Sequence, residues 1–90
     1  MRWQIEFQKT AQDALENLDK RAREQIEKYL DRLITLTDPR LRGKSLTGNR
    51  KGQWRYRVGD YRVICEIKDN ILTVLVLEIG HRRDVYKNNF

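Results

Sequence analysis

The stretch from Gln53 to Lys68, QWRYRVGDYRVICEIK, limits what this chain can fold into more than any other. Two runs of alternating residues flank Gly59-Asp60, a pair suited to the two-residue turn of a β-hairpin. With those two residues as the loop, the cross-strand pairs are Val58 with Tyr61, Tyr56 with Val63, Trp54 with Cys65, Arg57 with Arg62, and Arg55 with Ile64. The face that holds the first three pairs is wholly apolar, so we expect it to pack against the rest of the protein.

The other face of the predicted hairpin sets Arg57 opposite Arg62, with Arg55 nearby. Like charges directly opposite each other in a β-ladder are destabilising, so folding alone does not require this arrangement. An anion bound between the guanidinium groups would remove the cost, and we favour that interpretation. The alternative is that the arginines simply point into solvent. Relief of the repulsion also predicts that Arg62→Ala leaves stability equal or slightly higher.

The positive charge of the chain is concentrated in one segment. The 90 residues carry a net charge of +6. Between Pro39 and Arg62 there are eight basic residues and one acidic residue, a net of +7, whereas the remainder has a net of −1. A local excess of this kind is the electrostatic footprint of a nucleic-acid binder.

Composition excludes several classes of protein. Ninety residues predict one domain over residues 1–90. Cys65 is the only cysteine, which builds no disulfide framework and indicates a reducing, cytoplasmic setting. One cysteine and one histidine make a zinc site implausible, and no glycine-rich phosphate loop is present, so we expect no metal and no cofactor. No apolar run approaches the ~20 residues of a membrane span, and residues 1–8 hold no signal-peptide core, so we expect no membrane association.

The first half of the chain predicts a strand and two helices. Residues 2–8 alternate as a strand, and Thr10 is a candidate cap for a first helix. Asp19 is the candidate cap of a longer helix with apolar residues at three- and four-residue spacing. The outer face of this helix mixes positive and negative charges in i,i+4 pairs. Glu24 with Lys28 is a favourable pair, and Lys28 with Arg32 is not. We interpret this face as an ordinary solvated one.

The second half predicts a basic, glycine-containing loop over residues 40–52, the hairpin, and a last strand. Residues 71–79, ILTVLVLEI, are apolar on both faces, as in a strand covered from both sides. Alternation would put Leu75, Leu77 and Ile79 on the face of the arginines. We therefore predict an α+β fold, β-α-α-β-β-β with a short C-terminal helix. Its two helices would pack on one face of a mainly antiparallel four-stranded sheet.

Three motifs in these segments resemble the RelE/ParE superfamily of toxins: KSLTG from Lys44, GQWRYRVGDYRV from Gly52, and GHRRDVY from Gly80. The similarity covers nearly the whole chain. The first two motifs are shared by the RNA-cleaving and gyrase-inhibiting branches, whereas the third resembles the RelE branch. The resemblance implies a toxin of a type II toxin–antitoxin pair that enters the ribosomal A site and cleaves mRNA there. It also implies a cognate antitoxin as partner, in a hetero-oligomeric complex.

The resemblance carries over to individual residues. Arg55 and Arg57 fall where RelE-like toxins have basic residues on the second strand, and Arg62 matches the arginine after the hairpin turn. Arg82 matches the arginine after the last strand, and Tyr86 the tyrosine of the C-terminal helix. The best-known pattern has lysines in place of Arg55 and Arg57. Arginine effectively cannot lose its proton to act as a base, so the identity of the general base stays open.

These residues suit cleavage without a metal, in which the 2′-OH of the RNA attacks the scissile phosphate and leaves a cyclic phosphate. The guanidinium groups of Arg55, Arg57, Arg62 and Arg82 would neutralise charge on the phosphorane. His81, with a reference pKa of about 6.5, is a candidate for proton transfer, or else a plain surface residue. Tyr86 could transfer a proton, stack on a splayed base, or only pack the C-terminal helix.

Two functions from different classes follow. The first is a ribosome-dependent endoribonuclease, which GHRRDVY favours because a pure binder needs no His/Arg/Tyr constellation. The second is a ParE-like inhibitor that binds DNA gyrase without catalysis, with the basic loop as its interaction surface. A plain RNA-binding module is disfavoured, because Trp54 and Tyr56 belong to the predicted core. The basic residues expected to bind RNA and the ribosome are Arg40, Arg42, Lys44, Arg50, Lys51 and Arg83.

Overall fold

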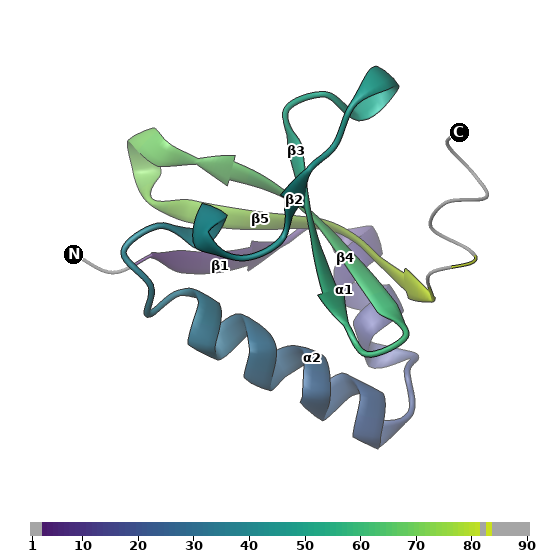
Figure 1. The fold of residues 1–90 in the computed structure, drawn as a ribbon. Coiled ribbons are helices and arrows are strands. Elements are labelled where there is room, and N and C mark those ends of the chain that lie inside the picture. Colours follow the sequence, from purple (N-terminus) through teal and green to yellow (C-terminus); the bar gives the residue numbers. More distant parts are fainter. Residues whose placement is uncertain (1–2, 82, 84–90) are drawn as a thin grey trace.

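A five-stranded sheet forms the centre of the fold (Figure 1). The computed structural model describes residues 3–81 and 83. The strands are β1 (Gln4–Phe7), β2 (Lys44–Ser45), β3 (Gln53–Val58), β4 (Tyr61–Lys68) and β5 (Thr73–His81). Their order across the sheet is β1-β5-β4-β3-β2; β1 runs parallel to β5, and the other neighbours are antiparallel. The α+β class is confirmed, but the predicted number of four strands is wrong.

The extra strand, β2, lies inside the stretch predicted as a loop. It pairs Lys44 with Arg55 and Ser45 with Trp54. The close approach depends on Gly43, because a Cβ there would lie 2.3 Å from the carbonyl oxygen of Arg55. Two residues are too few to show an alternating pattern, so the sequence gives no strand signal here.

Two helices, α1 (Lys9–Glu16) and α2 (Lys20–Leu33), pack on one face of the sheet. They bury Leu15 and Ile26 against Tyr56 and Val63 of the hairpin. Asp19 caps α2 as predicted, because its side chain accepts a hydrogen bond from the backbone N–H of Ala22. The predicted cap of α1 is wrong, since that helix begins at Lys9, before Thr10, and has no side-chain cap. Neither helix in the described part of the chain is long and apolar enough to cross a membrane.

The β3–β4 hairpin has the predicted register at every pair, from Trp54 with Cys65 to Val58 with Tyr61. Gly59 adopts φ +59°, as the first residue of a primed turn requires. Tyr56 and Val63 are completely buried beneath the helices. The apolar face of the hairpin is therefore the core face, as its alternation predicts.

The last strand departs from simple alternation. Its pairing with β4 shifts between Ile64 and Cys65, which lie opposite Glu78 and Val76, so Leu77 is an extra residue in β5. A β-bulge of this kind reverses the side-chain direction of everything after it. Ile79 consequently faces Val63 in the core, and the prediction that it shares a face with the arginines is wrong. Glu78 takes that position instead.

The last strand, predicted over residues 71–79, is β5, which starts at Thr73 and runs through Gly80 to His81. The C-terminal helix is predicted for the segment that follows. Residue 82 and residues 84–90 lie outside the described residues, so Arg82 and Tyr86 have no described position.

Candidate nucleic-acid interface

The sheet face turned away from the helices carries three arginines from the hairpin, and we call it the arginine face (Arg55, Arg57 and Arg62). Arg57 lies directly opposite Arg62, as the turn predicts. Arg57 is exposed, Arg55 is half-buried, and Arg62 retains only 4% exposure. Nη1 of Arg62 donates to the carbonyl oxygen of Tyr61 at 3.1 Å. A buried guanidinium interacts more strongly with an anion than an exposed one does, because less water screens the charge.

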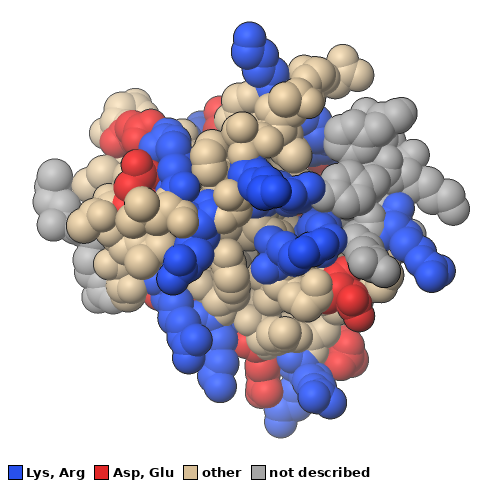
Figure 2. All heavy atoms as spheres, viewed as in Figure 1, with Lys and Arg blue, Asp and Glu red and all other residues tan. Residues whose placement is uncertain are grey.

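Lys44 extends the arginine face by one strand. It lies opposite Arg55 in the β2–β3 pair, and directly opposite residues point to the same side of a sheet. Lysine and arginine side chains gather in a band over β2, β3 and the neighbouring part of α2, whereas the acidic side chains lie towards the margins (Figure 2). The localised charge seen in the sequence is therefore also localised in space.

Arg50 behaves differently from the exposed loop residue that the sequence suggests. It ends a short 3₁₀ turn (Gly48–Arg50) and has a relative exposure of 9%. Nη1 donates to Oε1 of Gln53 at 3.0 Å, and Nη2 forms an ion pair with the carboxylate of Glu78. Arg50 therefore fastens the basic loop to β5. Sequence reasoning missed Glu78 because the bulge that turns it to this side has no sequence signature.

Arg40 is also held by carboxylates. Its guanidinium binds Asp69 at 3.0 and 2.6 Å and Asp38 at 3.3 Å. The hydrogen bond from Arg40 lowers the pKa of the Asp69 carboxyl. The structure does not bring Arg40 to the arginine face. The remaining loop cations, Arg42 and Lys51, are exposed.

His81 lies on the opposite side of the sheet from Arg62. It is paired with Tyr61 at the end of β5, and the two rings meet edge to face with centroids 5.8 Å apart. Arg83 is exposed, and its backbone N–H donates to Nδ1 of His81 at 3.4 Å. Among the described residues, the cations on β2, β3 and β4 thus come together, whereas the candidate histidine stands apart from them.

The aromatic and thiol groups of the hairpin serve the core. The hydroxyl of Tyr56 donates to the carbonyl oxygen of Pro39 at 2.8 Å, and burial raises its pKa. Trp54 is half-buried, and its Nε1 donates to the carbonyl oxygen of Arg42 at 2.6 Å. Cys65 is fully buried, and desolvation raises the pKa of its thiol. These residues are poorly suited to stacking with nucleic-acid bases or to nucleophilic attack.

Residues 5–86 match the family model of the ParE toxin of the type II toxin–antitoxin system parDE. The chain belongs to the RelE/ParE superfamily of toxins. The resemblance found in the sequence motifs is thereby confirmed at the level of the superfamily. No sequence among the curated proteins matches the chain.

Solved structures of RelE proteins share the fold. The toxin–antitoxin complex RelBE2 from Mycobacterium tuberculosis contains a chain with 28% identity and a TM-score of 0.82, covering 91% of this chain and 100% of that one. The archaeal RelE–RelB complex from Pyrococcus horikoshii gives 26% identity and a TM-score of 0.70, covering 91% and 97%. A double mutant of E. coli RelE in the free state has 23% identity and a TM-score of 0.78, covering 97% of this chain and 93% of that one. At this identity the similarity supports the fold alone.

Proposed function

We propose that this toxin is a ribosome-dependent endoribonuclease that cleaves mRNA in the A site and so inhibits translation. The observation that supports this most is the cross-strand pair of Arg57 with Arg62, which the fold maintains although it opposes like charges. The buried member of that pair is fixed by its surroundings, and the exposed member is open to a ligand. The exposed guanidinium of Arg57 can contact a phosphate, and Arg62 adds positive charge from the neighbouring strand.

The arginines would act on charge rather than on protons. When the 2′-OH attacks the scissile phosphate, the bond from phosphorus to the 5′-oxygen breaks and a 2′,3′-cyclic phosphate remains. Guanidinium donors already in position stabilise the charge that builds on the phosphorane oxygens. We assign this role to Arg55, Arg57 and Arg62, and keep Arg82 as a fourth member of the set.

Proton transfer stays with the two candidates that the sequence offers, Tyr86 from the resemblance and His81 from its residue type. Tyr86 is one candidate for the proton donor or acceptor. His81 is the other, although it faces Tyr61 rather than the arginines and would have to act from the end of β5. The pH–rate profiles of the wild type and of His81→Gln separate them. A rate that does not vary between pH 5.5 and 8 in either form excludes His81 and assigns the step to Tyr86 or to the RNA itself.

The partner we propose is a cognate antitoxin. RelE chains similar to this one were solved in complexes with RelB antitoxins, at 28% and 26% identity. The +6 charge of this chain and its basic band favour an acidic antitoxin, which would neutralise the arginine face in a hetero-oligomeric complex.

A second candidate is ParE-like inhibition of DNA gyrase. It is favoured by the match of residues 5–86 to the ParE family model and by the separation of His81 from the arginines. In that case the basic band would be a binding surface only, with no chemistry.

Primer extension on mRNA from ribosomes incubated with the purified toxin distinguishes the two. Cleavage at codon-phased positions is expected, with no effect on DNA supercoiling by gyrase. Intact message together with inhibited supercoiling would replace the proposal by the gyrase function.

A further inference from the structure

A second basic surface lies on the other side of β3, along helix α2. Two hollows with volumes of about 160 and 280 Å³ adjoin there and share Tyr29 and Arg32. The first is bounded by Leu33, Leu36 and Arg42, and the second by Gln25, Lys28, Arg57, Val58 and Gly59. We call the two hollows together the α2 groove.

The walls of the α2 groove are cationic on both sides. Lys28 and Arg32 stand on the helix, and Arg42 and Arg57 stand opposite on the basic loop and on β3. No acidic side chain lines either hollow, and none of the four cations forms an ion pair within the described part of the chain. Lys28 and Arg32 also form a like-charge i,i+4 pair, which costs helix stability. A bound anion would remove that cost.

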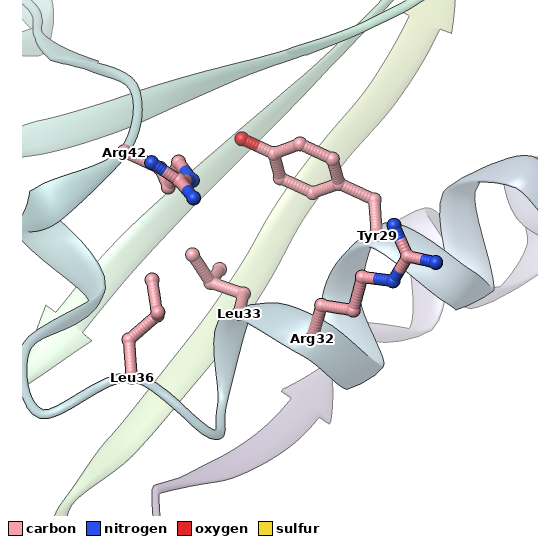
Figure 3. A pocket seen from close by; sticks show the side chains of 5 residues that line it. All are labelled: Tyr29, Arg32, Leu33, Leu36 and Arg42. Atoms are coloured by element: carbon pink, nitrogen blue, oxygen red, sulfur yellow. The ribbon is translucent and has the colours of Figure 1, made fainter.

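The floor of the groove is aromatic and apolar. Tyr29 and Leu33 project from α2, Leu36 from the segment after it, and Arg42 reaches in from the facing loop (Figure 3). The ring of Tyr29 packs against that of Tyr56 with centroids 5.9 Å apart, which holds it in place. Burial raises the pKa of Tyr29, so its hydroxyl stays protonated and can donate to a ligand oxygen. Cations at the rim and a fixed ring below suit a nucleotide, with its phosphate outside and its base or sugar inside.

Arg57 connects this groove with the arginine face. β2 pairs with β3 only at Trp54 and Arg55, so Arg57 lies on the free edge of the sheet. Arg57 pairs with Arg62 on the arginine face. Arg57 also lines the second hollow of the α2 groove. A polyanionic strand held at Arg57 is therefore in reach of both surfaces.

We propose that the α2 groove binds the RNA backbone next to the cleavage site, with Lys28, Arg32 and Arg42 as phosphate contacts and Tyr29 as the floor. This inference rests on the proposed function, because it takes RNA as the ligand. RNA fits better than an acidic protein segment, because the groove is continuous through Arg57 with the face that would hold the scissile phosphate.

The test compares two double variants of the 90-residue toxin chain. Lys28→Gln/Arg32→Gln removes one lysine and one arginine from the groove. Lys20→Gln/Arg21→Gln removes the same two residue types from exposed positions on the first turn of the same helix. Binding of a 2′-O-methyl RNA 12-mer, which cannot be cleaved, is followed by fluorescence anisotropy between 50 mM and 500 mM salt.

The groove variant should lose affinity about tenfold or more at 0.1 M salt. The slope of log K against log salt should fall by about 1.4, since each lost contact to single-stranded RNA contributes roughly 0.7. The control variant should match the wild type. Equal slopes for the two variants, or a wild type that cleaves message on ribosomes but does not bind the 12-mer, would overturn the inference and leave the proposed function intact.

Two further readouts complete the design. If the groove variant binds RNA normally but no longer binds the antitoxin, the occupant is an acidic protein segment and the RNA assignment is wrong. Message left intact by the wild type, in the primer-extension assay above, is the separate sign that the proposed function has failed.

Discussion

The effect of Arg62 on stability is interpreted differently from the sequence and from the structure. From the hairpin register alone, repulsion between Arg62 and Arg57 is the main effect on stability. Replacing Arg62 should then not lower the free energy of unfolding. In the folded protein it is 4% exposed and donates to the carbonyl oxygen of Tyr61. Its apolar stem therefore contributes packing as well as charge.

We accordingly expect Arg62→Ala to lower the free energy of unfolding by about 1–3 kcal/mol, in the range for a buried side chain that loses packing and hydrogen bonds. Arg62→Met, which keeps most of the stem, should recover part of that loss. Urea denaturation of both variants measures the effect. An alanine variant as stable as the wild type would mean that repulsion with Arg57 outweighs packing after all.

The buried thiol of Cys65 predicts how stability depends on pH. Burial raises its pKa above the ordinary value of 9.0, so the unfolded chain releases this proton at a lower pH than the folded chain does. The contribution of this thiol to stability is therefore constant below about pH 9 and falls as the pH rises further. At pH 10 the loss from this group should reach about 1.4 kcal/mol.

Urea midpoints measured between pH 7 and pH 10 test this, with Cys65→Val as the variant that cannot titrate. The stability of the variant should stay nearly constant up to pH 10, where Tyr56 and Tyr29, whose pKa values burial also raises, begin to add their own loss. If the urea midpoint falls with pH equally in the variant and the wild type, the thiol of Cys65 is not the group that causes the loss of stability.

Among the elements, β2 is the one that decides where the basic loop lies. It brings Lys44 beside Arg55, and it depends on Gly43, which has φ +76° and almost no room for a side chain. Gly52, in the same loop, has φ +95° but open space around it.

Gly43→Ala should therefore destabilise the protein by both effects: about 1–2 kcal/mol for the left-handed backbone and about 1–3 kcal/mol for the overlap with Arg55. Gly52→Ala should show only the loss that comes from the left-handed backbone, because the space around Gly52 is open. Thermal unfolding of the two variants provides the comparison, and hydrogen exchange at Arg55 would report whether β2 has detached. Similar losses for both would argue that β2 contributes little to holding the loop.

The sequence predicted those elements whose pattern is local. The hairpin register follows from one turn, and the start of α2 follows from the cap at Asp19, so both are correct. The bulge at Leu77 and the two-residue β2 depend on contacts between segments distant in sequence. Glu78, and the burial of Arg50 against it, could not be foreseen for the same reason.

On the scale of the whole molecule, the apolar and the charged side chains lie in different places. The helices and the apolar face of the sheet make the core, and the exposed cations gather over β2, β3 and the neighbouring part of α2 (Figure 2). The arginine face and the α2 groove meet at Arg57, on the free edge of β3. A strand of RNA crossing that edge would meet cations on both sides.

The single-turnover rate of mRNA cleavage on ribosomes, for Arg57→Ala, tests the central claim most directly, because Arg57 is exposed and its loss should leave the fold intact. Arg21→Ala removes an exposed arginine from α2 and is the matched control. We expect Arg57→Ala to slow cleavage about 100-fold, as for the loss of one preorganised donor to a transition state, and Arg21→Ala to cleave at the wild-type rate. An Arg57→Ala toxin that cleaves as fast as the control would contradict the assignment of the arginine face to the scissile phosphate.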